Sequence, residues 1–212
     1  MKNLLIWGAT GQSLVLDELF KKSEYKLVAL FDKDIKVSSP LDVPLFHEES
    51  ELFDFMAPLK EIHFVVAIGG AKGKDRLRVH NFLKERGLLS IRAIHSKAMI
   101  ADDVIVGEGC QIMIGAVVAT KTLLGTSVIV NSSASIDHEC DIGDGAHIGP
   151  GVKMAGCIRI GEKSFIGTGA IIAPRVTIGS NTIIGAGSLV LKNIPDNVVA
   201  FGTPANVVRQ NS

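Results

Sequence analysis

Residues 124–148 read LGTSVIVNSSASIDHECDIGDGAHI and belong to a longer stretch in which every sixth residue is aliphatic. The pattern holds at sixteen consecutive positions: Ile100, Val106, Ile112, Val118, Leu124, Val130, Ile136, Ile142, Ile148, Met154, Ile160, Ile166, Ile172, Ile178, Ile184 and Val190. A period of six matches neither an α-helix, with about 3.6 residues per turn, nor a single strand, whose side chains alternate. It is typical of a β-helix, in which each hexapeptide forms one flat side of a coil.

The fifth position of each hexapeptide, counted from the aliphatic residue, is small or β-branched throughout. Such residues favour strands, and the smallest of them fit a narrow interior. We therefore interpret Cys110 and Cys140, which occupy this position, as core residues rather than reactive thiols. The three cysteines show neither a CxxC pair nor a metal-binding spacing, which argues against a disulfide framework and against a metal site.

The second position is Gly in eight of the sixteen hexapeptides, and Asn131 and Asp137 are two of the exceptions. A repeated glycine relaxes the steric limits on the backbone at a corner. Asn131 and Asp137 either tolerate the left-handed backbone angles expected at this position, or mark a site at which the repeat departs from its rule. The sequence leaves both interpretations open.

Residues 1–95 follow a different pattern, that of a small parallel α/β sheet. Apolar runs predict strands at 2–7, 25–31 and 62–68, helical spacing predicts helices at 12–22 and 72–86, and the stretch 35–60 is expected to be irregular. Ligands of such sheets bind beyond the carboxyl ends of the strands. The residues expected there are Gly8, Thr10, Gly11, Gln12, Asp32, Lys33 and Gly69. The Gly8–Gly11 loop would hold a phosphate at the start of a helix, or it is only a tight turn.

The densest polar stretch of the repeat, residues 131–141, contains His138. In a three-sided coil of eighteen residues, His138 stacks directly on Gly156, so that a histidine faces outward beside a bare backbone. Glu139 and Asp141 would orient the imidazole and keep it basic. Because histidine titrates near neutrality, His138 is a candidate acceptor for the proton of an attacking amine or hydroxyl.

The composition excludes several classes of partner. Basic and acidic residues number 22 each, so no overall field attracts nucleic acid or an anionic membrane. No apolar stretch is long enough to span a bilayer, and the N-terminal run breaks at Gly8 without a cleavage site of small residues. We expect a cytoplasmic protein that binds neither nucleic acid nor membrane.

The glycine-loop front, the hexapeptide repeat and the stretch from Asn131 to Glu139 together resemble the sugar acetyltransferases of the sialic-acid and bacillosamine pathways. That family includes nucleotide-aminosugar N-acetyltransferases, and the resemblance spans essentially the whole chain. It implies a Rossmann-like, nucleotide-sugar-binding α/β domain over residues 1–95. It also implies a left-handed triangular β-helix with a C-terminal tail over residues 96–212. The family is trimeric, with acetyl-CoA in the clefts between subunits, and it needs no metal.

The resemblance also implies roles for individual residues. His138 would be the general base that deprotonates the acceptor amine, Glu139 would support it, and Asn131 matches a polar active-site position. The acetyl-CoA site would comprise Gly156, whose N–H holds the thioester oxygen, together with His147, Gly202, Pro204 and Ala205. The front loop and Asp32 would hold the nucleotide. Gln12 and Asn206 depart from the family pattern, which often has His and Lys at these places.

The predicted function is therefore acetyl transfer from acetyl-CoA to the amine of a nucleotide-linked amino sugar, by direct attack, in the synthesis of surface-glycan precursors. One alternative is O-acetylation of sialic acid or another sugar hydroxyl, which would need no nucleotide. The other is a non-catalytic, nucleotide-binding β-helical scaffold. Binding of a UDP or GDP compound would argue against the first alternative, and failure to bind any acyl-CoA would support the second.

Overall fold

The computed structural model describes residues 1–211, which form two compact units. The first unit comprises Met1–Ile68 and Arg78–Ala93, and the second comprises Gly69–Leu77 and, within the described residues, 94–211. The short segment 69–77 thus groups with the repeat rather than with the sheet that precedes it. None of the helices in the described residues is long and apolar enough to cross a membrane.

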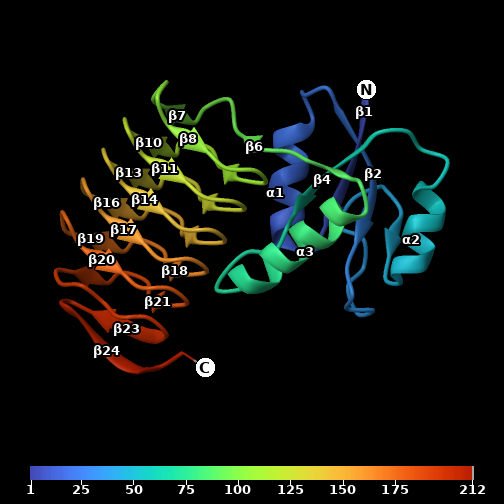
Figure 1. Ribbon diagram of the computed structural model, residues 1–212. Coiled ribbons are helices and arrows are strands. Elements are labelled where there is room, and N and C mark those ends of the chain that lie inside the picture. Colours follow the sequence, from blue (N-terminus) through green and yellow to red (C-terminus); the bar gives the residue numbers. More distant parts are fainter. Residues whose placement is uncertain (212) are drawn as a thin grey trace. The chain divides into compact units, whose positions relative to one another are not determined.

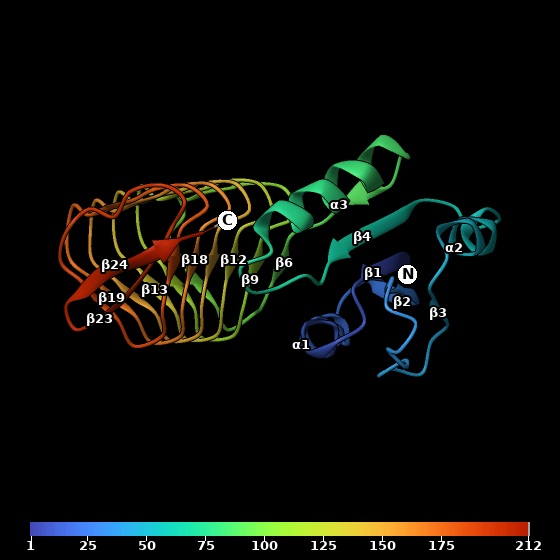
Figure 2. The ribbon, with the colours of Figure 1, turned by 90° about the horizontal axis from the view of Figure 1, so that it is seen from below.

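The first unit is a five-stranded parallel sheet of order β3-β2-β1-β4-β5 with helices on both faces. Its elements are β1 Lys2–Trp7, α1 Gly11–Phe20, β2 Tyr25–Phe31, β3 Leu45–Phe46, α2 Glu49–Met56, β4 Ile62–Val66, α3 Gly73–Glu85 and β5 Leu89–Ser90. The first five residues of α3, 73–77, group with the second unit. Figure 2 shows α1 on one face of this sheet and α3 on the other. From β1 the chain crosses through α1 to β2, toward one edge of the sheet, and from β4 it crosses through α3 to β5, toward the other edge. Because both crossovers are right-handed, the two helices lie on opposite faces. The predicted parallel α/β sheet is confirmed.

The expectation of an irregular stretch at 35–60 is wrong in part, because it contains β3 and α2. Proline residues bracket α2 without interrupting it, since Pro44 precedes the helix and Pro58 follows it. The helix buries Leu52 and Met56, which lie four residues apart on one face. Prolines in this region therefore mark the ends of a helix rather than its absence.

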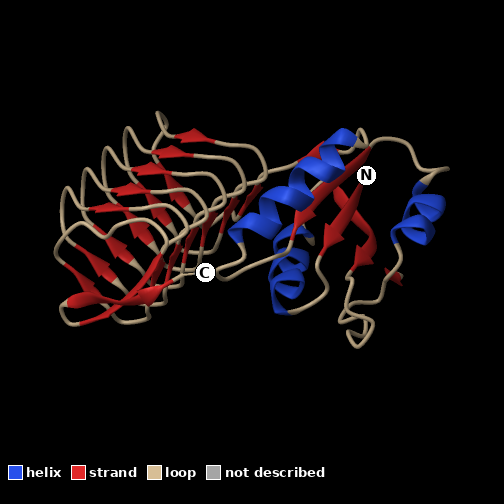
Figure 3. Ribbon diagram, turned by 60° about the horizontal axis from the view of Figure 1, so that its bottom comes forward, coloured by secondary structure: helices blue, strands red, loops and turns tan. Residues whose placement is uncertain are grey.

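The second unit is a left-handed parallel β-helix built from short strands on three flat sides (Figures 1 and 3). Its two-residue strands are β6 Ala93–Ile94, β7 Met99–Ile100, β8 Ile105–Val106, β9 Gln111–Ile112, β10 Val117–Val118, β11 Leu123–Leu124, β12 Ile129–Val130, β13 Ser135–Ile136, β14 Asp141–Ile142, β15 His147–Ile148, β16 Lys153–Met154, β17 Arg159–Ile160, β18 Phe165–Ile166, β19 Ile171–Ile172, β20 Thr177–Ile178, β21 Ile183–Ile184 and β22 Leu189–Val190. The chain ends in an antiparallel hairpin of β23 Val198–Gly202 and β24 Ala205–Gln210.

The register of the three sheets confirms a coil of eighteen residues. Ile129 pairs with His147, and His147 pairs with Phe165 in the next coil. The other two sides keep the same spacing, with Val117 beside Ser135 and Leu123 beside Asp141. Each residue of a coil therefore stacks on the residue eighteen places away.

The interpretation of the second position as the left-handed corner is wrong. Positive φ angles occur at the fourth position instead, for example at Lys121 (56°), Glu139 (56°) and Cys157 (61°). Glycine is needed at the second position because the next coil lies against it: a Cβ added to Gly107 would come within 2.4 Å of the Gly125 carbonyl oxygen. Asn131 is not among the residues with positive φ, so left-handed tolerance does not explain its place in the repeat.

The core of the β-helix consists of the first and fifth positions of the repeat, as predicted. Cys110 and Cys140 lie in this core and are almost completely inaccessible to solvent. Burial is the main cause that raises the pKa of the Cys140 thiol, which keeps it protonated and unreactive. Cys157 differs, because it occupies the fourth position at a corner and is partly exposed.

Candidate functional site

The structure confirms that His138 stacks on Gly156. A Cβ added to Gly156 would lie 2.5 Å from Nε2 of His138, so glycine is required for the ring to occupy its place. The Cys157 N–H donates a hydrogen bond of 2.9 Å to the His138 carbonyl, which locks the two coils together at this corner. The imidazole faces outward, with 47% of the His138 side chain exposed.

Glu139 fixes the orientation and the protonation pattern of the His138 ring. Its Oε2 lies 3.0 Å from Nδ1 of His138. An ionised carboxylate can only accept a hydrogen bond, so in the neutral ring Nδ1 carries the proton and Nε2 carries the lone pair. The basic nitrogen is therefore the one beside Gly156. Asp141, expected to help Glu139, instead lies in β14, where it pairs with Leu123 and Arg159.

The Gly156 N–H has no hydrogen-bond partner among residues 1–211. In two other coils a carboxylate accepts the N–H at this third position: the Thr126 N–H donates to Asp144 at 2.7 Å and the Ser180 N–H to Asp196 at 2.7 Å. Gly156 is buried beneath the His138 ring. Because buried backbone donors are nearly always paired, the unpaired N–H of the glycine that stacks on His138 is a candidate donor to a bound group.

A second pair, Asn131 and His147, lies in the same β-helix. The Oδ1 of Asn131 accepts the Ser132 N–H at 2.7 Å, which fixes the orientation of the amide. Its Nδ2 then faces Nε2 of His147 at 3.1 Å and donates to it. The proton of His147 therefore resides on Nδ1, and the structural role of Asn131 is to set this tautomer.

His147 is buried and neutral near pH 7. Burial, followed by the charge of Arg76, lowers the pKa of His147 to about 4. Its ring also contacts Phe165 edge-on, with the ring centroids 5.2 Å apart. A neutral, buried imidazole can shape a site and hold a hydrogen bond, but it does not act as a cation there.

Arg76 is a site residue that sequence reasoning missed. It is completely buried in the second unit, where its Nε donates to the Ser127 carbonyl at 2.9 Å. A terminal nitrogen reaches the carbonyls of Gly145 and Ala146, directly before His147. Burial lowers the pKa of Arg76 to about 10, which still leaves the guanidinium charged near pH 7.

We expect the low pKa of His147 to make the protein less stable in mild acid. The unfolded chain binds a proton at this histidine near pH 6.5, whereas the folded chain resists protonation down to about pH 4. The stability from neutral His147 is therefore complete above pH 6.5, and about 3 kcal/mol of it is lost as the pH falls to about 4. Urea unfolding at several pH values, compared with His147→Gln, measures this contribution. Equal losses of stability in both proteins would contradict it.

The front loop of the first unit combines a tight turn with an open helix start. Gly8 has φ +109°, and a Cβ there would lie 2.6 Å from the Ala67 carbonyl oxygen, so only glycine fits. Gly11, in contrast, begins α1 in open space, with no atom within 4 Å of an added Cβ. Thr10 precedes the helix without a side-chain cap, and the first turn holds no acidic residue. Such a helix start can accept an anion.

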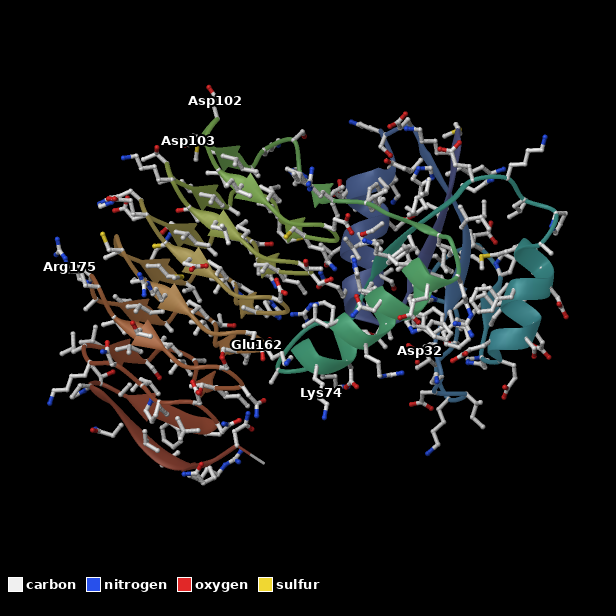
Figure 4. All side chains as sticks on the ribbon, in the orientation of Figure 1. Asp32, Lys74, Asp102, Asp103, Glu162 and Arg175 are labelled. Carbon is white, nitrogen blue, oxygen red and sulfur yellow. The ribbon has the colours of Figure 1, made fainter. Side chains whose placement is uncertain are left out.

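Asp32 and Lys33 lie at the end of β2 and already have partners within the first unit. The Asp32 carboxylate accepts the Ala9 N–H at 2.9 Å and the Asp34 N–H at 3.0 Å, so it braces the glycine loop. Lys33 forms an ion pair of 3.0 Å with Glu49. Figure 4 labels Asp32. The predicted residues Gly8, Thr10, Gly11, Gln12 and Asp32 thus surround one turn between β1, β2 and α1.

The remaining predicted residues lie in the second unit. Gly69 groups with the β-helix, where an added Cβ would lie 3.7 Å from Cε1 of His147. Gly202 and Ala205 face each other across the β23–β24 hairpin, and Pro204 lies in its turn. Gly69 also follows closely on Ala67, whose carbonyl lies against Gly8 of the front loop. Its role in nucleotide binding stays a prediction.

The chain matches two protein families. Residues 3–81 match the family described as PglD N-terminal domain, and residues 157–192 match the bacterial transferase hexapeptide family with six repeats. A curated relative, GDP-perosamine N-acetyltransferase of Escherichia coli O157:H7, is 31% identical over 104 residues. That match covers 49% of this chain and 46% of the relative, so it spans about half of the relative's length.

Solved structures resemble the whole chain. PerB of Caulobacter crescentus, in complex with CoA and GDP-perosamine, is 31% identical, with 98% of each chain covered and a TM-score of 0.90. The acetyltransferase domain of PglB from Neisseria gonorrhoeae, in complex with acetyl coenzyme A, is also 31% identical. It covers 98% of this chain and 99% of its own, with a TM-score of 0.88. The chain therefore belongs to the family of hexapeptide-repeat sugar acetyltransferases that carry a PglD-type N-terminal domain.

Proposed function

We propose that this protein transfers the acetyl group of acetyl-CoA to the amine of a nucleotide-linked amino sugar. The amine nitrogen attacks the thioester carbonyl carbon while Nε2 of His138 takes up the proton of the amine. Collapse of the tetrahedral intermediate then breaks the carbon–sulfur bond, and the imidazolium returns the proton to the departing CoA sulfur. Glu139 stabilises the imidazolium through Nδ1.

The contact of His138 with Glu139 and Gly156 carries this proposal. Nε2, which carries the lone pair, stacks on Gly156, whose N–H has no partner in the described residues. Acyl transfer needs both groups, a base for the nucleophile and a donor for the oxygen of the intermediate. PerB, 31% identical over 98% of its chain, is solved with CoA and GDP-perosamine bound, which supports an amine on a nucleotide sugar as the acceptor.

We further propose that the first unit binds the nucleotide and that the second carries out the transfer, with His147, Gly202, Pro204 and Ala205 along the coenzyme. The open start of α1 at Gly11 supports a phosphate site, because backbone N–H groups and the helix dipole favour an anion there. Asp32 would act by holding the loop in shape, since backbone N–H groups already occupy its carboxylate.

A panel of acceptors tests the proposed reaction. We expect acetylated product with acetyl-CoA and one of the UDP-, GDP- or dTDP-linked amino sugars, and none with the same sugars that carry a hydroxyl in place of the amine. Product is measured by mass spectrometry, with protein lacking acetyl-CoA as the control. Acetylation of free sialic acid, with no preference for a nucleotide, would instead establish the O-acetyltransferase.

We also propose that the protein is a homotrimer with active sites between subunits, as its outer surface suggests. Ile105 and Leu123 pair on the outward face of the sheet of β8 and β11, and 63% of Ile105 is exposed. Side-by-side exposed aliphatic residues favour a surface that another copy covers. Sedimentation equilibrium is expected to give three times the chain mass of 22.5 kDa. Ile105→Asp should shift the mass toward the monomer. A monomeric wild-type protein would contradict the proposal.

A further inference from the structure

We propose that His138, Glu139 and Cys157 form a binding site for a thiol-seeking divalent metal ion, for which Zn²⁺ is the probe, and that the bound ion inhibits acetyl transfer. These are the only three His, Cys, Asp or Glu side chains in residues 1–211 whose donor atoms gather closely enough to share an ion. The inhibition rests on the proposed function, whereas the binding of metal does not.

The donor atoms lie at distances that zinc can bridge. All three are within 4.8 Å of one another. Nδ1 of His138 is 3.0 Å from Oε2 of Glu139, and the same oxygen is 4.0 Å from Sγ of Cys157. A tetrahedral zinc ion, with bonds of about 2.0 Å to nitrogen or oxygen and about 2.3 Å to sulfur, holds its ligands roughly 3.3–3.8 Å apart. Small rotations of exposed side chains therefore suffice.

The backbone holds the three donors in place before any ion binds. Glu139 and Cys157 occupy the same corner position in consecutive coils, with φ angles of 56° and 61°. The hydrogen bond from the Cys157 N–H to the His138 carbonyl fixes the spacing between these coils. A rigid scaffold lowers the entropy lost when the ligands converge on an ion.

The residues above and below this corner leave the site accessible. Asp103, Lys121 and Arg175 continue the same column at steps of eighteen residues. Asp103 lies three coils before Cys157, where it accepts hydrogen bonds from Thr120 and Lys121. Figure 4 shows Arg175 extending outward from the β-helix, away from the coil. The thiol of Cys157 is partly exposed, unlike those of Cys110 and Cys140.

Metal binding would remove the lone pair that catalysis needs. In the free protein Nδ1 carries the proton and Nε2 the lone pair. An ion on Nδ1 takes the lone pair of that nitrogen, so the single proton of the neutral ring resides on Nε2 and the base is lost. Cys157 releases its own proton to solvent as it becomes a thiolate ligand. No oxidant or reductant takes part.

Cobalt and zinc titrations of the full-length protein test this inference. Co²⁺ is expected to produce a thiolate-to-metal charge-transfer band, which Cys157→Ser abolishes and Lys121→Ser, at the same corner two coils before Cys157, retains. Zn²⁺ is expected to inhibit the wild type reversibly, and Cys157→Ser should need at least about 10-fold more zinc for half-inhibition relative to its own rate. Rates are measured from the acetylated product, because free CoA binds zinc, and EDTA should restore them.

The outcomes separate the two proposals. Absence of the cobalt band in the wild type, or equal zinc sensitivity of the wild type and Cys157→Ser, overturns the metal site even if acetyl transfer is observed. A band that depends on Cys157 in a protein with no acetyl transfer supports the site and refutes the proposed function. A band that depends on Cys157 without any inhibition of an active enzyme shows that the ion does not reach Nδ1 of His138, and overturns the inhibition.

Discussion

Replacing His138 with alanine is expected to lower the rate of acetyl transfer by about 10²–10⁴-fold, the usual effect of removing a general base. The lone pair on Nε2, which Glu139 directs toward Gly156, has no substitute at this corner. Because 47% of the His138 side chain is exposed, its removal should change stability little. Steady-state rates from product formation, with thermal unfolding as the check on folding, measure the effect.

The matched control is Glu162→Ala, at the same third position of a different hexapeptide, where its side chain pairs only with the adjacent Lys163 in the described contacts. This variant should keep the wild-type rate. Acetyl-CoA binding to His138→Ala should also persist, because the base acts on the acceptor amine. A rate for His138→Ala within a few-fold of the wild type would remove His138 from the role of base.

Replacing Gly156 with alanine is expected to lower the rate by about 10³-fold. The added Cβ would lie 2.5 Å from Nε2 and 2.6 Å from Cε1 of His138, so the imidazole must move away from its present position. Gly156 does not have a positive φ, so the backbone itself accepts alanine without strain. The loss should therefore appear in the rate, with a small change in the free energy of unfolding.

A double-mutant cycle shows whether this loss passes through His138. If the Cβ acts by displacing the ring, adding Gly156→Ala to His138→Ala should cost far less than it costs in the wild type. Equal costs in the two backgrounds would mean that the methyl group blocks the coenzyme instead. A wild-type rate for Gly156→Ala would refute the requirement for glycine.

The period of the repeat was sufficient to predict the coil and the stack of His138 on Gly156. A residue count of eighteen determines which side chains meet, because each coil lies in register on the next. The same count gave the buried positions of Cys110 and Cys140. These predictions follow from periodicity alone, and for that reason they identify the correct individual residues.

Contacts that depend on the path of the backbone were not predictable from the period. Glycine at the second position could be needed either for a positive φ angle or for a close approach of the backbone. The structure shows that the approach of the next coil is the cause.

Arg76 has a signal in the sequence: it lies three and seven residues before Val79 and Leu83, on the apolar stripe of α3. A charged residue on the apolar face of a helix indicates a buried side chain whose charge is paired with polar groups. Its carbonyl partners come from residues more than fifty places away and leave no trace in the local pattern.

Because the coils stack in register, the length of the β-helix can change in steps of one whole coil. Each turn touches only its two neighbours, so the geometry at His138 depends on the turn that follows it and not on how many turns lie beyond. Evolution can therefore lengthen or shorten such a molecule by whole turns of eighteen residues without disturbing the chemistry. A single inserted residue between positions 138 and 156, in contrast, would rotate every later side chain to the wrong column.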